Sequence, residues 1–129
     1  MNLNPVPDRT GEEVRVLVEA EVAKFTSPDF AKGLKTFLVK PRSEIRTWDW
    51  HKPLKEFQVW IVAESSRFDY GIAFSDYGFG PEYPWGLVFS SHSNCDADYC
   101  WYSSLEEAYK ESRLLEEYEE SRRAQSGNG

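Results

Sequence analysis

The middle of the chain alternates between apolar and polar residues, and only short turns separate the alternating runs. The alternation begins at Glu44 and is clearest over residues 56–64, where β-branched and aromatic side chains are dense. Two further runs of this kind follow, at residues 70–75 and 85–90. The connections are too short to contain a crossover helix, so these strands must pair antiparallel. The sequence therefore predicts a four-stranded antiparallel meander.

Helical patterns precede this region. Thr10 and Glu13 fit a capping box, in which each side chain accepts a hydrogen bond from a backbone N–H at the start of a helix. Apolar residues then recur at helical spacing over residues 12–25, although the same stretch also alternates, so a strand remains the alternative to the helix we expect. A second helix is predicted over residues 28–38, ending before Pro41.

A third helix is predicted over residues 103–123, with an apolar stripe on one side and seven glutamates between residues 106 and 120 on the rest of its surface. The expected fold class is α+β: a four-stranded antiparallel sheet with the N-terminal helices and this acidic C-terminal helix packed on one face. Residues 1–9 are expected to form a flexible arm, residues 10–123 a single domain, and residues 124–129 a disordered tail.

The net charge of -7 is concentrated in one part of the chain. Residues 56–120 carry 14 acidic and 3 basic side chains, whereas residues 24–55 carry 3 acidic and 8 basic ones. The simpler interpretation is that the two segments pair within one fold. The functional interpretation is an acidic surface that attracts a basic protein. This charge argues against nucleic acid and against an anionic membrane as partners.

The first residues contain neither a basic cluster nor an apolar stretch of the kind a secretory signal needs, so a cytoplasmic location is expected. The longest uncharged apolar run is residues 59–63, far short of the roughly 20 residues that cross a bilayer. Aromatic residues make up 16% of the chain, which argues for a folded core rather than disorder.

Residues 76–86 form the most distinctive segment, because three glycines and two prolines are interleaved there with four aromatic residues. Such a loop is typical of a binding surface, although its aromatic side chains can also fold back onto the sheet.

The motif Gly78-Phe79-Gly80-Pro81, followed by Pro84-Trp85-Gly86-Leu87, resembles a family of uncharacterised small bacterial proteins. Trp48-Asp49-Trp50, and Trp101 with Leu105-Glu106 and Ala108, are similar to that family as well. The resemblance spans residues 37–112 and implies a bacterial source, but no activity and no catalytic residues.

Metal and catalytic motifs are weak. His92, Cys95 and Cys100, with the distant His51, lack the paired spacing of a zinc site. Carboxylates beside turn glycines, such as Asp69, usually cap turns. We therefore expect no metal, no cofactor and no enzymatic activity.

Two functions from different classes remain open. The first is a non-enzymatic, inhibitor-like or immunity-like module that binds a basic protein. Its candidate residues are acidic or aromatic: Glu111, Glu116, Glu117, Glu119, Glu120, Tyr77, Phe79, Tyr83 and Trp85. The alternative is a small-ligand pocket under the loop 76–86, with a floor formed by Trp48, Trp50, Trp60 or Trp101. A scaffold that buries its aromatic residues between identical copies is a third possibility.

Overall fold

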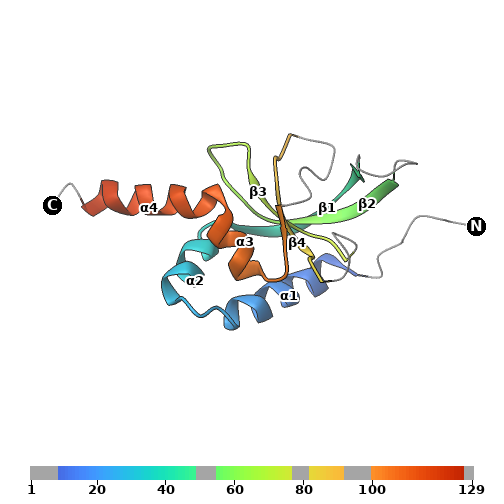
Figure 1. Cartoon of the computed structure of the whole chain (residues 1–129), viewed down its shortest axis with the longest axis horizontal. Helices are drawn as coiled ribbons and strands as arrows, with labels where there is room; N and C mark the ends of the chain where they lie inside the picture. The colour runs from blue at the N-terminus through green and yellow to red at the C-terminus, as the bar shows by residue number, and fades with distance from the viewer. Residues whose placement is uncertain (1–8, 49–54, 77–81, 92–99, 127–129) are drawn as a thin grey trace, which may run out of the picture.

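The computed structural model describes residues 9–48, 55–76, 82–91 and 100–126. The sheet in this part of the chain is antiparallel and has the strand order β1-β2-β3-β4-β5. The α+β class is confirmed, whereas the predicted number of four strands is wrong (Figure 1). The elements, in chain order, are α1 (Gly11–Ala23), α2 (Pro28–Lys35), β1 (Leu38–Trp48), β2 (Lys55–Glu64), β3 (Gly71–Phe74), β4 (Trp85–Val88), β5 (Trp101–Tyr102), α3 (Leu105–Glu111) and α4 (Arg113–Ser126).

The additional strand is β5, which extends the meander at its far edge. It contains two residues, Trp101 and Tyr102, which pair with Gly86 and Trp85 of β4. Two residues are too few to display an alternating pattern, so sequence periodicity cannot reveal such a strand. Its pairing depends on contacts with β4.

The stretch predicted as helix or strand over residues 12–25 is helical rather than extended, as the capping box predicted, and the helix ends at Ala23. Thr10 Oγ1 accepts a hydrogen bond from the backbone N–H of Glu13 at 3.2 Å, and Glu13 Oε1 accepts one from the N–H of Thr10 at 2.9 Å. These bonds satisfy two backbone donors that a helix start otherwise leaves unpaired. Val14 and Val18, one turn apart on α1, are buried against the sheet.

The transition from helix to sheet comes earlier than predicted. The second helix ends at Lys35 instead of Leu38, and β1 begins at Leu38 instead of Glu44. Pro41, expected to lie between the two elements, is inside β1. It is tolerated there because β1 is an edge strand whose register shifts between Leu38 and Arg42, so the missing N–H interrupts no regular ladder.

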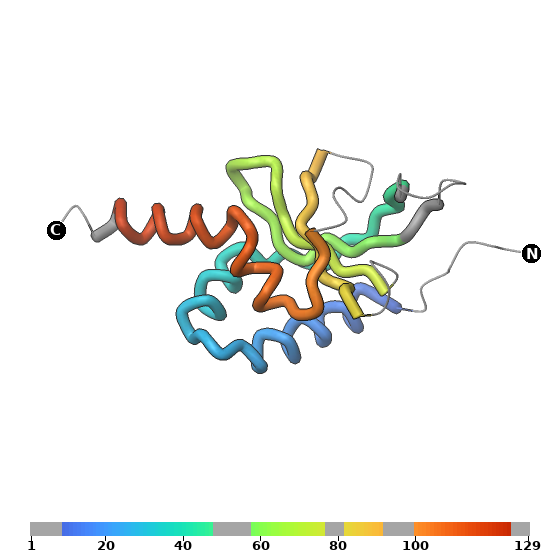
Figure 2. Tube along the Cα trace, viewed as in Figure 1, coloured from blue at the N-terminus to red at the C-terminus, as the bar shows by residue number. Residues whose placement is uncertain are grey.

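The single C-terminal helix predicted over residues 103–123 is instead two helices, and the chain changes direction between them (Figure 2). The break is at Ser112, which has extended backbone angles, φ -87° and ψ 159°. The Ser112 hydroxyl donates to the carbonyl of Tyr109 at 2.7 Å, and such a local bond competes with helical hydrogen bonding. The second helix, α4, continues to Ser126, past the expected boundary at residue 123.

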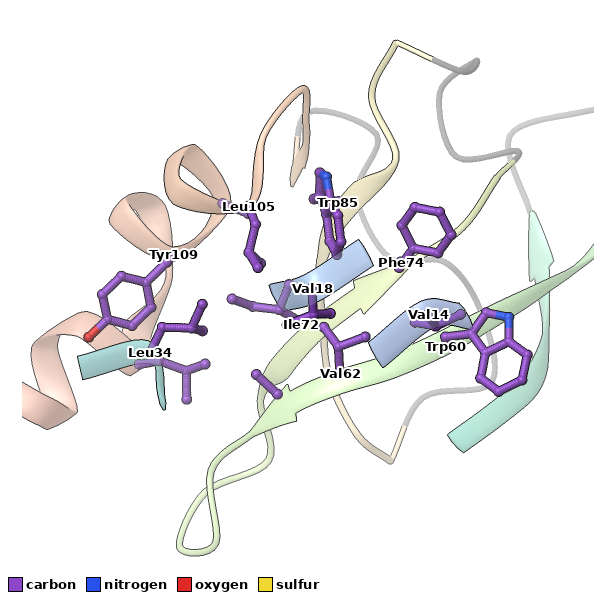
Figure 3. Close-up of a cluster of buried hydrophobic side chains, with 13 residues drawn as sticks. Val14, Val18, Leu34, Trp60, Val62, Ile72, Phe74, Trp85, Leu105 and Tyr109 are labelled. Atoms are coloured by element: carbon purple, nitrogen blue, oxygen red, sulfur yellow. The ribbon is translucent and has the colours of Figure 1, made fainter. Parts of the chain in front are cut away.

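Helices α1 and α3 pack on one face of the sheet, where their side chains meet alternate residues of the strands (Figure 3). Helix α4 packs mainly against α2 and α3, and only its first turn, through Leu114, reaches this core, so the predicted packing of the acidic C-terminal helix on the sheet is not confirmed. Trp60 and Val62 of β2 face this main core, together with Trp85 of β4. Val59 and Ile61, which flank Trp60 in the strand, point to the opposite face and belong to a second buried cluster, as the period of two requires. Both faces of the central strands are therefore buried.

Candidate functional site

Four of the five predicted carboxylates lie on the surface of α3 and α4. They are exposed and form no hydrogen bond or ion pair with the part of the chain that the structure describes. These four, which we call the acidic face, are Glu111, Glu116, Glu119 and Glu120. The last three are spaced three and four residues apart, so they share one side of α4. This helix extends from the end of the molecule opposite the start of α1 (Figure 1).

Glu117, the fifth predicted carboxylate, has a different role. Its Oε1 accepts hydrogen bonds of 2.8 Å from both Ser65 Oγ and Tyr70 Oη. Burial, together with the bond to the Glu117 carboxylate, raises the pKa of Tyr70 well above its usual range. Glu117 therefore anchors α4 to the β2–β3 turn and lies outside the acidic face.

Most other described carboxylates are engaged within the fold. Glu64 forms an ion pair with Arg42 at 2.8 Å, and that guanidinium lowers the pKa of the carboxyl group. Glu106 accepts hydrogen bonds of 3.0 Å from the backbone N–H of Thr26 and of Ser27, which lower its pKa in the same way. Further engaged carboxylates are Glu12, Glu19, Glu21, Asp29, Glu44, Asp69 and Asp76. Among the described residues, the unpaired negative charge is thus concentrated on α3 and α4.

The predicted aromatic residues do not form one exposed cluster. Trp85 is only 3% exposed and packs against Phe74, with ring centroids 4.9 Å apart, so it belongs to the core. Tyr83 is 44% exposed and is available to a partner. Tyr77 and Phe79 lie outside the described residues.

A pocket of about 350 Å³ lies between α1 and the adjoining ends of β3 and β4. Phe74, Pro84 and Trp85 line its strand side, and the ion pair of Arg9 with Asp76, 2.8 Å long, lies at the same site. The floor was predicted to contain Trp48, Trp50, Trp60 or Trp101. Trp60 and Trp101 lie in the two buried clusters instead, while Trp50 and the side chain of Trp48 lie outside the description.

The pocket and the acidic face belong to different regions of the molecule. The helix α4 packs mainly against α2 and α3, whereas the pocket lies between α1 and the sheet. Trp85, the candidate aromatic residue that lines the pocket, is therefore not part of the acidic face.

Arg9 is the residue of the pocket that sequence reasoning missed, since it was assigned to the flexible arm. Its partner Asp76 is 67 positions away, and no local pattern connects the two. Asp69, expected to cap a turn, accepts a hydrogen bond of 2.8 Å from the backbone N–H of Ser91. These contacts arise only when the strand ends are assembled.

The metal-capable residues are mostly outside the description. Cys100 is half-buried, whereas His51, His92 and Cys95 are not described. Within the described ranges, no three His, Cys, Asp or Glu side chains converge on a common point that could hold a metal ion. Among the helices of these same ranges, none combines the length and apolar character needed to cross a bilayer.

No protein-family model, curated protein or solved structure matches this chain. The fold and the surface are therefore the basis for its classification. They define a small α+β protein with a five-stranded antiparallel meander, whose last two helices carry the exposed carboxylates of the acidic face.

Proposed function

We propose that this protein is a non-enzymatic binding module that engages a basic protein through the acidic face. The observation that carries the proposal is that its four carboxylates are exposed and form no ion pair with any described residue, while most other described carboxylates form bonds within the fold. Like charges three or four residues apart destabilise a helix by about 0.2–0.5 kcal/mol per pair. A basic partner would relieve this repulsion.

The expected partner carries a cluster of lysine or arginine side chains. Exposed ion pairs contribute little each, about 0–1 kcal/mol, so the charge acts mainly by steering the partner and raising the association rate. Arg113 and Arg123 also lie exposed on α4, and this mixture of charges favours a protein surface over an imitation of nucleic acid. If the partner uses its basic surface for its own activity, binding would cover that surface and inhibit the partner, as an immunity-like protein does.

The test is capture of partners from a bacterial lysate at low and at moderate salt, followed by affinity measurements on the recovered protein. The triple variant E116Q/E119Q/E120Q is expected to reduce the association rate at least tenfold. The control E12Q/E19Q/E82Q makes the same change in net charge at exposed positions outside α3 and α4, and it also removes the two ion pairs of Arg15 with Glu12 and Glu19. Equal losses in both variants, or binding that is insensitive to salt, would contradict the acidic face as the binding surface.

A second candidate function is binding of a small ligand in the pocket between α1 and β3–β4. It is supported by the aromatic walls, Phe74 and Trp85, beside the ion pair of Arg9 with Asp76. A ligand there is expected to change tryptophan fluorescence and to raise the melting temperature, and the variant R9Q is expected to weaken both effects. Responses that are identical in R9Q would place the ligand elsewhere.

A further inference from the structure

A second hollow, larger than the pocket beside α1, lies along α4 on the side away from the acidic face. This groove has a volume of about 650 Å³, within the usual size range of small-molecule sites. It runs between α2 and α4 and reaches the β2–β3 turn. Its lining residues on α4 are Glu117, Tyr118, Ser121 and Arg122. They fall on the side of the helix opposite Glu116, Glu119 and Glu120, so the groove and the acidic face do not overlap.

The groove is basic, although the chain as a whole is acidic. Lys32 of α2, Arg67 of the β2–β3 turn and Arg122 line it, against one carboxylate, that of Glu117. Lys32 and Arg67 are exposed and form no ion pair with the residues that the structure describes. They come from two different walls of the groove, α2 and the β2–β3 turn.

Arg122, the third basic residue of the groove, is partly engaged by other side chains. Arg122 Nη1 forms an ion pair of 2.6 Å with Asp29, and the Arg122 guanidinium lies 5.6 Å from the centre of the Tyr118 ring. A guanidinium has five N–H donors, so this contact leaves others for a ligand. Lys32 and Arg67 thus bring two cations to the groove that form no ion pair with a described residue, against the single carboxylate of Glu117.

The other lining groups favour an organic ligand over a bare ion. Phe37 and Tyr118 supply apolar aromatic surface. The Ser121 hydroxyl is a further donor in the groove, since it bonds to no described residue. The Glu117 carboxylate receives its two internal hydrogen bonds at Oε1, so Oε2 can accept from a ligand hydroxyl or amine.

We propose that this groove binds a small organic anion, with its oxyanion group held by Lys32 and Arg67 and its planar apolar part against Phe37 and Tyr118. Phosphate and carboxylate groups share the required chemistry, since each accepts charge-assisted hydrogen bonds from a lysine and an arginine. The site is independent of the proposed partner binding, because it uses none of the residues of the acidic face.

The test is a titration of the full chain followed through its backbone amide NMR signals. The probes are phenyl phosphate, phenylacetate, inorganic phosphate and phenol. At least one of the two aromatic anions is expected to shift the signals of the groove residues saturably, and the comparison between them identifies the preferred oxyanion. Inorganic phosphate and phenol, each lacking half of the required chemistry, are expected to bind at least tenfold more weakly.

The variant K32Q/R67Q is expected to weaken the binding of the aromatic anion at least tenfold. Both side chains are exposed and free of ion pairs to described residues, so the fold should be retained. The control K35Q/R123Q makes the same change in net charge at exposed positions outside the groove lining and is expected to leave the affinity unchanged.

Three results would overturn the proposal. They are the absence of saturable shifts with both aromatic anions, an equal loss of affinity in the two variants, and groove signals that shift with protein concentration when no probe is present. The last result would identify the groove as an interface between copies of this chain. None of these results bears on the acidic face, so the two proposals fail separately.

Discussion

Replacing Gly33 by alanine should destabilise the protein, although alanine is the better helix former. Gly33 lies in α2 and is buried at the junction with α3 and α4. A methyl group there would lie far inside van der Waals distance of Tyr109 Oη and 2.9 Å from Tyr118 Cδ2. Tyr109 is 0% exposed and packs edge-on against Phe30, with ring centroids 5.8 Å apart, so its ring cannot move into solvent.

The expected magnitude follows from two opposing effects. Alanine in a helix interior is favoured over glycine by about 1 kcal/mol, whereas overpacking a core costs about 1–3 kcal/mol. Because the nearest obstacle is a fully buried side chain, the clash should dominate. We expect G33A to lose about 1–2 kcal/mol of the free energy of unfolding, which corresponds to a fall in melting temperature of about 4–8 °C.

The assay is urea denaturation of G33A, Y109F and the double variant. The Tyr109 hydroxyl has no hydrogen-bond partner among the described residues, so Y109F should keep or slightly raise the stability. Removing this oxygen also opens space for the new methyl group, so G33A should cost less in the Y109F background, by about 1 kcal/mol. Tyr118 Cδ2 remains close, so the recovery should be incomplete.

The matched control is G11A. At Gly11 an added methyl group would lie 3.5 Å from both Pro41 O and Trp60 Cζ3, which are ordinary contacts. Its stability should equal or slightly exceed that of the wild type. A G33A protein as stable as the wild type, or a Y109F background that gives no relief, would refute the packing described for α2, α3 and α4.

Three further predictions concern single contacts. E117Q should lose about 1–2 kcal/mol of stability in urea denaturation, because a charged acceptor for Tyr70 becomes neutral, and an equal loss in E116Q would contradict this explanation. G86A should lower the melting temperature strongly, at a cost of about 2–3 kcal/mol, since its methyl group would lie 2.5 Å from Trp101 Cδ2; an unchanged melting curve would place β5 elsewhere. The pKa of Glu106 is lowered in the folded state, so the stabilisation it gives is complete above the ordinary pKa and disappears as the pH falls through the lowered value. The stability difference between the wild type and E106Q should therefore shrink below about pH 4, and a difference independent of pH would contradict this hydrogen bonding.

Local patterns were sufficient for the fold class. The capping residues Thr10 and Glu13 act within one helical turn, and the alternation in β2 extends over neighbouring residues, so both can be recognised without knowledge of the rest of the fold. The two-residue strand β5 and the break at Ser112 depend on contacts with other elements or on a single side-chain bond. Periodicity does not detect features of that size.

In the candidate site, too, local sequence explains some features and contacts between distant residues explain others. Glu116 and Glu117 are adjacent and identical in type, so sequence reasoning placed both on the binding surface. The structure leaves Glu116 exposed but brings Glu117 to Ser65 and Tyr70, which are 52 and 47 positions away. The cations Lys32 and Arg67 likewise lie in separate parts of the sequence and meet at one groove only through the packing of α2 and α4 beside the sheet.

The clearest example is a pair of neighbours in β1. Alternation alone determined that Ile45 and Arg46 point to opposite faces of the strand. Only the tertiary structure decided which face is buried: Arg46 is 1% exposed and Ile45 is 60% exposed, the reverse of what their residue types suggest. Arg46 shares its face with the cluster around Val59, where its guanidinium pairs with the Glu44 carboxylate and donates to a backbone carbonyl. The period of a strand is a local property, whereas the choice of buried face depends on the register with β2 and on the elements packed on each side of the sheet.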